Sequence, residues 1–198
     1  MAGVVAGVLA HRDRGDGLIV EGLAIVSADG MIADRSGVQP DALKLEADQR
    51  FFHDSLRAAD VIVHGRHSGE GGPQAHDRRR IILSRRVPGV ARDPDNARTV
   101  IWNPAGAPFA QACKLLDAPG NRVAVIGGTD VFGLFLELGY DAFHLSRAAK
   151  ARLPGGRPVF PGVPERTPEE LLASHGLKPG ETRLLDAPTG LTLTTWRP

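Results

Sequence analysis

Apolar positions follow two alternating patterns along the 198-residue chain. Short runs rich in valine and isoleucine stop at glycine or at a polar cluster, which is typical of buried strands. Longer segments repeat apolar residues every three or four positions, as the core face of a helix does. We predict strands over residues 18–27, 60–64, 80–84, 99–102, 122–126 and 140–145, and helices over residues 41–59, 104–116 and 129–138.

The hydrophobic pattern changes in the C-terminal part of the chain. Residues 181–186 and 191–196 are two strand-like runs separated by Pro188-Thr189-Gly190, which predicts an antiparallel hairpin. Strands that alternate with helices predict a mostly parallel sheet covered by helices on both faces. We therefore predict an α/β fold in a single domain, residues 1–198, with an antiparallel finish.

Composition and charge narrow the function classes. The formal net charge of +1 gives no global attraction to nucleic acid or to a membrane surface. No apolar run reaches the roughly 20 residues needed to cross a bilayer, and residues 4–10 lack the features of a signal peptide. The only cysteine, Cys113, excludes an internal disulfide and fits a reducing compartment. The cytoplasm is therefore the expected location.

Several kinds of site are not indicated. The seven histidines show no metal-ligand spacing, and no cysteine pair is present to complete a zinc site, so we predict no metal. The zinc-deaminase signature and the P-loop are also missing. The few aromatic residues are not interleaved with a basic stripe, which argues against nucleic-acid binding.

Two predicted strands end in glycine turns that suit phosphate binding. Residues 61–65 lead into Arg66, His67 and Ser68, and residues 123–126 lead into Gly127-Gly128. Glycine allows a ligand to approach the backbone N–H groups, and a pyrophosphate can lie at the start of the following helix. An ordinary strand-to-loop turn and tight strand–helix packing remain the alternatives. Two such ends in one small chain suggest a phosphorylated dinucleotide.

A third strand end carries a hydroxyl followed by guanidinium groups. Ser84, Arg85 and Arg86 come directly after the strand at residues 80–84. This set is suited to an adenosine 2′-phosphate, and a solvated basic loop is the alternative.

Two carboxylates are candidates for proton transfer. Asp48 lies close to the apolar stripe of the helix at 41–59, so we expect it to be half-buried with a raised pKa. A boundary carboxylate paired with arginine is the alternative for Asp48. Asp29, in Ser27-Ala28-Asp29-Gly30, is the competing acid at a strand's C-terminal end, although Asp-Gly is above all a turn signal.

Taken in order, these segments resemble the dihydrofolate reductase superfamily, which includes the reductase domain of the bifunctional riboflavin-biosynthesis deaminase-reductase. The resemblance covers roughly residues 19–196 and implies a three-layer sandwich. The matching segments are residues 24–33, 61–68, 81–84, 125–132 and 141–146, with Gly156 and Phe160-Pro161 following. Since the deaminase signature is missing, the resemblance concerns the reductase alone.

The resemblance implies NADPH as cofactor, Asp48 as the catalytic acid, and Arg78 in the place where folate reductases hold the substrate's carboxylate; Asp29 remains the second candidate acid. It places the cofactor against three sets of residues. The nicotinamide set is the segment from Ala24 to Ile32. The phosphate set is Gly65, Arg66, His67, Ser68, Gly127, Gly128 and Thr129, with Val131 and Phe132 behind it. The 2′-phosphate set is Ser84 and Arg85, and Ile126 is a further expected cofactor-binding residue.

The resemblance leaves the substrate open between pteridine-like and pyrimidine-like heterocycles. Thr129 stands where the family has a third glycine, and the loop after Ile32 lacks the tryptophan of folate-reducing members. A nucleotide-binding module without catalysis is therefore the alternative function. The partner we expect is a small-molecule substrate, and the C-terminal hairpin offers an edge at which a homodimer can form.

Overall fold

The computed structural model describes residues 17–68 and 75–198, and nearly all of its strands join one sheet. The strands are β1 (Ile19–Ser27), β2 (Met31–Ala33), β3 (Val61–Gly65), β4 (Arg80–Leu83), β5 (Val90–Arg92), β6 (Thr99–Trp102), β7 (Arg122–Val125), β8 (Ala142–Ala148), β9 (Arg157–Pro158), β10 (Lys178–Asp186) and β11 (Leu191–Arg197). The helices are α1 (Glu46–Ala58), α2 (Phe109–Leu116), α3 (Thr129–Leu138) and α4 (Pro168–Ser174).

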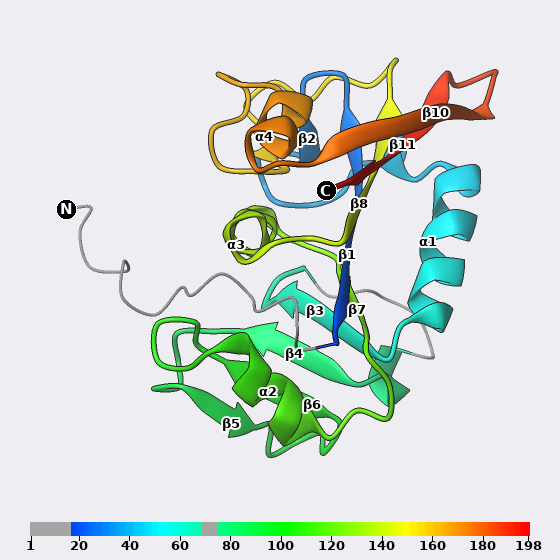
Figure 1. Ribbon diagram of the computed structural model, residues 1–198. Helices are drawn as coiled ribbons and strands as arrows, with labels where there is room; N and C mark the ends of the chain where they lie inside the picture. The colour runs from blue at the N-terminus through cyan, green and yellow to red at the C-terminus, as the bar shows by residue number, and fades with distance from the viewer. Residues whose placement is uncertain (1–16, 69–74) are drawn as a thin grey trace.

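The main sheet has nine strands in the order β10-β11-β8-β1-β7-β3-β4-β6-β5 (Figure 1). The six strands from β8 to β6 run parallel to one another. At the two ends of this order, β5 pairs antiparallel with β6, and the β10–β11 hairpin pairs antiparallel with β8. The prediction of a mostly parallel sheet with an antiparallel finish is confirmed.

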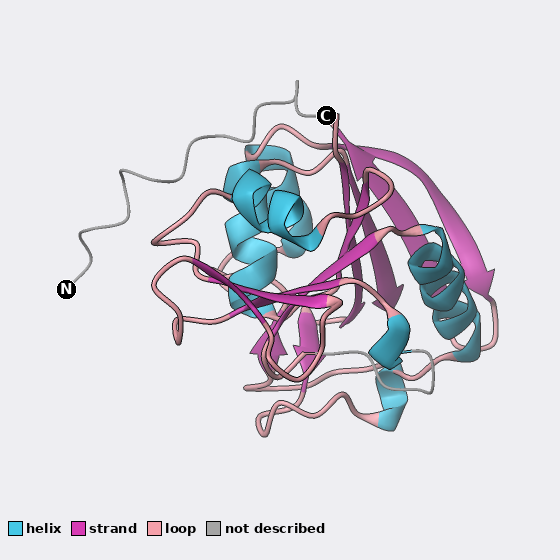
Figure 2. Cartoon of the chain, turned by 90° about the horizontal axis from the view of Figure 1, so that it is seen from below, coloured by secondary structure: helices cyan, strands magenta, loops and turns pink. Residues whose placement is uncertain are grey.

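Helices cover both faces of the sheet and form the outer layers of a three-layer sandwich (Figure 2). Phe135 and Leu136 of α3, Phe109 of α2 and Leu172 of α4 belong to the large core on one face. Leu56 of α1 packs with Leu23, Ile62 and Ala124 on the other face. Alternate residues of β1 therefore reach opposite faces, as expected of a strand between two helical layers.

Two helices begin later than the hydrophobic pattern predicts. Residues 41–43 form a separate short 3-10 helix, because Leu43 is buried against the β1–β11 side of the core, and α1 starts only at Glu46. Residues 103–107 form a turn around Asn103, whose side-chain oxygen accepts from the amide of Ala105 at 3.2 Å. Pro108 then restricts the residue before it to an extended conformation, so that α2 starts at Phe109.

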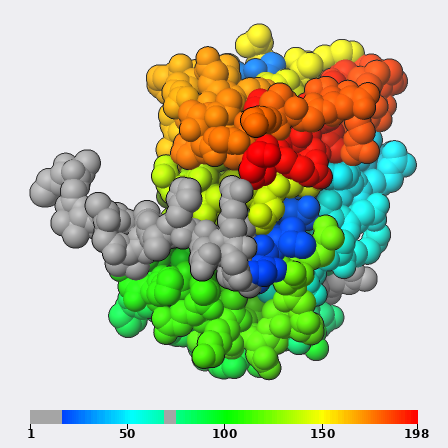
Figure 3. Space-filling view, viewed as in Figure 1, coloured from blue at the N-terminus to red at the C-terminus, as the bar shows by residue number. Residues whose placement is uncertain are grey.

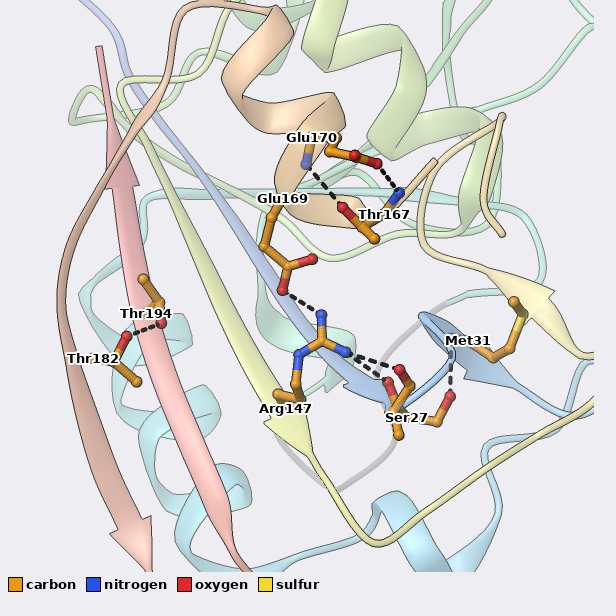
Figure 4. A network of polar contacts seen from close by, with 9 residues as sticks. Ser27, Met31, Arg147, Thr167, Glu169, Glu170, Thr182 and Thr194 are labelled. Carbon is orange, nitrogen blue, oxygen red and sulfur yellow. Dashed lines mark hydrogen bonds and ion pairs between the residues drawn. The ribbon is translucent and has the colours of Figure 1, made fainter. Parts of the chain in front are cut away.

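Other boundaries differ by a few residues, and three short strands and one α-helix are absent from the predictions. β8 covers 142–148 instead of 140–145, since Tyr140 leaves the strand and its hydroxyl donates to the carbonyl of Phe132 at 3.2 Å. The hairpin extends to 178–186 and 191–197. The elements not predicted are β2, β5, β9 and α4. Of these, α4 has a readable signal, because Thr167 and Glu170 form a capping box (Figure 4).

None of the helices in the described ranges is both long and apolar enough to cross a lipid bilayer.

Candidate functional site

The three phosphate-type segments lie at the ends of neighbouring strands. β7, β3 and β4 are adjacent in the sheet, with Val63 opposite Val125 and Gly65 opposite Leu83. Their C-terminal ends therefore meet at one edge, where Gly127, Gly65 and Ser84 follow one another across the sheet. The carboxyl ends of parallel strands are the usual location of ligand sites in such folds.

The two glycine turns contact each other directly. The amide of Gly65 donates to the carbonyl of Gly127 at 2.8 Å, and the peptide bond between Gly127 and Gly128 is cis. A Cβ atom on Gly128 would lie 2.9 Å from the hydroxyl oxygen of Ser68. Gly127 has a φ of 109°, and a Cβ there would lie 2.8 Å from the ring of Phe132. Side chains at these two positions would fill the cradle, so the backbone surface requires glycine.

Helix α3 begins at this cradle with Gly128 as its N-cap and no capping side chain. The first backbone N–H groups of a helix carry a partial positive charge that favours phosphate. The hydroxyl of Thr129 turns away from the cradle and donates to the carbonyl of Pro158. Any contribution of Thr129 to pyrophosphate binding is thus limited to its backbone. Val131 and Phe132 are buried behind the turn.

A cavity of about 420 Å³ adjoins the cradle and extends between α1 and the sheet. Its lining includes seven of the predicted cofactor residues. These are Ala24, Ile32, His67, Ser68, Ile126, Gly128 and Phe132. Gly65, Gly127, Thr129 and Val131 lie behind or beside this lining, and Arg66 and Arg85 are exposed. The cavity therefore joins the glycine cradle to the helix that carries Asp48.

Asp48 is the one carboxyl-bearing side chain among the described residues that line the cavity, and it is 8% exposed. Burial raises the pKa of its carboxyl to about 6, although the Ser146 hydroxyl, by hydrogen bonding to the carboxylate, opposes part of this rise. Asp48 is thus more deeply buried than the half-burial expected from the helical pattern, and the direction of its pKa shift agrees with that expectation. A carboxylic acid in this environment can carry a proton close to neutral pH.

The wall opposite Asp48 contains residues that the sequence patterns did not single out. His144 and Ser146 lie two apart on β8 and face α1, where Phe51 packs edge-on against the His144 ring at a centroid distance of 5.3 Å. Other lining residues that were not predicted are Gln39, Gln49, Phe52 and His53. The spacing of His144 and Ser146 is a strand signal for two polar groups on one face.

His144 is held from behind by polar neighbours. Its Nδ1 lies 3.0 Å from the Thr195 hydroxyl, and its Nε2 lies 3.7 Å from a carboxylate oxygen of Glu21. His144, together with Arg122, lowers the pKa of Glu21 in spite of partial burial. The imidazole orientation at the cavity wall is thus fixed by two other strands, β11 and β1.

The structure does not bring Asp29 to the cavity. Its carboxylate accepts from the Ser27 hydroxyl at 2.6 Å and from the amide of Leu153 at 3.0 Å. Burial opposes the charge, but these hydrogen bonds favour it more strongly and hold the pKa of Asp29 below its ordinary value. Asp29 therefore fixes the β1–β2 turn to the loop at 153 and is a poor proton donor at neutral pH.

The same turn is held by Arg147 of β8 (Figure 4). Its guanidinium donates to the carbonyls of Ser27 and Ala28, both at 3.2 Å, and forms an ion pair with Glu169 of α4. The Ser27 hydroxyl also accepts from the amide of Met31 at 3.0 Å. This network sets the direction of β2, whose residues Ile32 and Ala33 line the cavity.

Arg78 also lies elsewhere than the resemblance implies. Its guanidinium donates to the carbonyl of Leu56 at 2.7 Å, near the end of α1, and Arg78 does not line the cavity. Ser84 accepts from the amide of Arg86 at 3.2 Å, which shapes the loop where Arg85 projects into solvent. Within residues 17–68 and 75–198, no three His, Cys, Asp or Glu side chains are grouped so as to hold a metal ion.

Comparison with known proteins gives information on the fold, because the matches are to solved structures. No protein-family model matches the sequence, and no curated protein sequence matches it. Among solved structures, the chain is similar to a protein assigned to riboflavin biosynthesis from Shewanella sp. PV-4, with a TM-score of 0.62 and 20% identity over 91% of this chain and 98% of that chain.

Two further solved structures are similar to the chain. A pyrimidine reductase-like protein from Corynebacterium diphtheriae matches with a TM-score of 0.61 and 16% identity, over 91% of each chain. A diaminohydroxyphosphoribosylaminopyrimidine deaminase/5-amino-6-(5-phosphoribosylamino)uracil reductase from Thermotoga maritima matches with a TM-score of 0.62 and 20% identity, over 93% of this chain and 57% of that chain. The chain thus has the dihydrofolate reductase-like α/β fold that these structures share.

Proposed function

We propose that the protein is an NADPH-dependent reductase that transfers a hydride to a small heterocycle of the pteridine or pyrimidine type. The observation that carries this proposal is that one cavity joins a glycine cradle to a buried carboxylic acid. Two of the similar structures are a uracil reductase and a pyrimidine reductase-like protein, which supports the pyrimidine side of this choice.

The residues at the sheet edge fit NADPH. The cradle at Gly127 and Gly128 leaves space that a Cβ atom would fill, and the uncapped start of α3 offers N–H groups to a pyrophosphate. Ala24, Ile32 and Ile126 give an apolar wall for the nicotinamide, and Ser84 with Arg85 would hold the 2′-phosphate. When bound, NADPH supplies the hydride, and the protein supplies orientation and electrostatics.

Asp48 would supply the proton that accompanies the hydride. Its pKa of about 6 keeps part of the carboxyl population protonated near neutral pH. The Ser146 hydroxyl orients the carboxyl group from β8, and Phe51 and Phe52 provide aromatic surfaces beside it. A flat heterocycle in this cavity would therefore meet a proton donor on α1 and the nicotinamide at the sheet edge.

The direct test is binding and turnover of NADPH. Nicotinamide fluorescence measures binding, and loss of absorbance measures oxidation in the presence of a panel of pterins, ribitylamino- and phosphoribosylamino-pyrimidines, and quinones. We expect binding at submillimolar NADPH and oxidation with at least one pterin or pyrimidine. No binding in this range would refute the proposal.

Two variants separate the possible outcomes. Asp48→Asn should bind NADPH as the unmodified protein does and lose turnover, whereas Asp54→Asn, on the exposed side of the same helix, should change neither. Tight NADPH binding without oxidation by any member of the panel would favour the alternative, a nucleotide-binding module without catalysis.

A further inference from the structure

The interior of the cavity beside α1 combines apolar surfaces with a carboxyl group. Leu23 and Ile25 of β1 line it from the sheet, and Phe51 and Phe52 line it from α1. Asp48 lies in the same lining and is buried. At about pH 8 its carboxyl is largely ionised, because this pH is well above its pKa of about 6. A ligand in the cavity therefore meets apolar surfaces and, at that pH, a negative charge.

The mouth of the cavity carries neutral amide side chains. Gln39, just before the 3-10 helix at residues 41–43, and Gln49 of α1 both line the cavity and are both exposed. In Figure 3, α1 (cyan) forms part of the molecular surface beside the C-terminal hairpin. An amide side chain offers N–H donors and a carbonyl acceptor, which suit the hydroxyl and amide groups of a ligand. The mouth is thus suited to an uncharged polar substituent.

Basic side chains on the neighbouring elements are directed to other partners. Arg50 pairs with Glu46 at 3.3 Å, Arg57 pairs with Asp54 at 2.6 Å, and all four side chains are largely exposed. Arg147 of β8 is held at the β1–β2 turn. None of the described residues that line the cavity is a lysine or an arginine, although these two side chains are the usual partners of phosphate and carboxylate groups. The described lining thus offers an anionic ligand no such partner.

The histidine of the inner wall directs both ring nitrogens to protein groups. The Nδ1 atom of His144 lies 3.0 Å from the Thr195 hydroxyl, and its Nε2 atom lies 3.7 Å from a carboxylate oxygen of Glu21. Phe51 packs edge-on against the same ring. His144 therefore extends the aromatic wall beside Phe51, and its N–H group is directed to the protein and not to a ligand.

From this distribution of charge, we propose that the substrate is a flat heterocycle without a phosphate or carboxylate group, whose neutral polar substituent lies at Gln39 and Gln49. This inference rests on the proposed reductase function, because it names the substrate class of the same cavity. A phosphate carries a charge of about −1.5 to −2 near neutral pH, and in the cavity it would face the ionised Asp48. Like charges repel more strongly inside a protein than in water.

Pyrimidines with a sugar-alcohol substituent and pterins with a hydroxyalkyl substituent both belong to this class. The proposed substrate differs from that of the Thermotoga maritima reductase, whose name specifies a phosphoribosylamino group. The sequence of residues 69–74, which follows Ser68, contains a glutamate and neither lysine nor arginine. The composition of this segment therefore supplies no basic side chain for a phosphate.

The test compares matched ligands that differ only in the anionic group. One pair is a ribitylamino-pyrimidine with and without a terminal phosphate, and the other is a hydroxymethyl-pterin with and without a phosphate ester. Calorimetric titration of the full chain at about pH 8 gives the dissociation constant of each ligand, and we expect the neutral member to bind at least about tenfold more tightly in one pair or both. Because binding is measured without turnover, a failure of NADPH binding or oxidation is seen separately from a failure of this inference.

Three variants test the electrostatic reason. Gln49→Arg places a guanidinium at the mouth and should tighten binding of the phosphorylated member about tenfold. Gln111→Arg adds the same charge at an exposed position of α2 outside the cavity lining, and should leave both dissociation constants unchanged. Asp48→Asn removes the negative charge and should reduce the preference for the neutral member. Circular dichroism and thermal unfolding show whether each variant is folded.

Four results would overturn the inference. They are equal or tighter binding of the phosphorylated members, binding of neither member of either pair, equal effects of Gln49→Arg and Gln111→Arg, and an unchanged preference in Asp48→Asn. His53 is exposed and lines the cavity from α1. A preference for the phosphorylated member that His53→Ala abolishes would therefore identify His53 as the anion-binding group and would also overturn the inference.

Discussion

The buried carboxyl of Asp48 should leave a measurable signature in the stability of the protein. Its pKa is raised from an ordinary value of 3.8 to about 6. Each tenfold difference in proton affinity is worth about 1.36 kcal/mol, so ionising Asp48 in the folded protein costs about 3 kcal/mol more than in the unfolded chain. The perturbation that isolates this cost is Asp48→Asn, which keeps the shape of the side chain and removes its titration.

The direction of the effect follows from proton linkage. The folded protein holds the Asp48 proton more tightly than the unfolded chain does, so stability falls as the pH rises through the interval between the two pKa values. With pKa values of 3.8 and about 6, about 2 kcal/mol of the total is lost between about pH 4.5 and about pH 7.5. The asparagine variant has no such loss, and should therefore gain about 2 kcal/mol relative to the unmodified protein over the same interval.

Urea unfolding of both proteins at the two pH values measures this difference, because the change in packing caused by the substitution is the same at both and cancels. Asp54→Asn is the matched control, since Asp54 is an exposed carboxylate on the same helix, paired with Arg57. For Asp54→Asn, the change in unfolding free energy relative to the unmodified protein should differ little between the two pH values, as expected of a surface ion pair. If the Asp48→Asn variant gains no more between the two pH values than the control does, the reasoning about a buried, weakly acidic Asp48 is refuted.

Two further predictions concern the cofactor cradle. Arg85→Ala should weaken NADPH binding about tenfold and NADH binding little, because only NADPH carries the 2′-phosphate that a guanidinium would bind. Fluorescence titration with both nucleotides measures this difference, with Arg92→Ala on β5 as the control. Equal losses of affinity for both nucleotides would contradict the assignment of Arg85 to the 2′-phosphate. Gly127→Ala should destabilise the fold by about 1–3 kcal/mol in urea unfolding, since the new methyl group would lie 2.8 Å from the Phe132 ring at a φ of 109°. Gly139→Ala separates the contact from the backbone strain, because Gly139 also has a positive φ but no atom lies within 4 Å of the added Cβ. An equal loss of stability in both variants would show that the contact with Phe132 contributes nothing.

The glycine turns of the site, which present backbone groups, could be predicted from the sequence better than the side-chain contacts of the cavity. Gly65, Gly127 and Gly128 end valine- and isoleucine-rich runs, and such runs predict strands and turns from local pattern alone. Asp48 could be placed because a helical wheel relates it to the apolar stripe of its own helix. The pairing of Asp48 with Ser146, or of Phe51 with His144, depends on which strand lies opposite α1, and no local pattern contains that information.

The same limit explains the two residues that the structure places away from the cavity. Arg78 was positioned by its distance along the chain from the strand at 80–84, yet its guanidinium is held by a carbonyl of α1, 22 residues earlier. Asp29 follows β1 at the correct sheet edge, but the partner that turns it away, Leu153, is 124 residues distant. In both cases a long-range hydrogen bond decides where the side chain points, and spacing along the sequence cannot show it.

The environments of the two candidate acids distinguish between them more clearly than their positions along the sequence do. Asp29 accepts hydrogen bonds from a hydroxyl and an amide, and these stabilise its charged form and lower its pKa. Asp48 is buried beside apolar and aromatic side chains, which disfavour the charged form and raise its pKa to about 6. When two carboxyl groups in one region have their pKa values pushed in opposite directions, the group with the raised pKa is the acid and the other remains ionised. Under the proposed reductase function, Asp48 is therefore the group that would deliver the proton, because it faces the cavity and has the raised pKa.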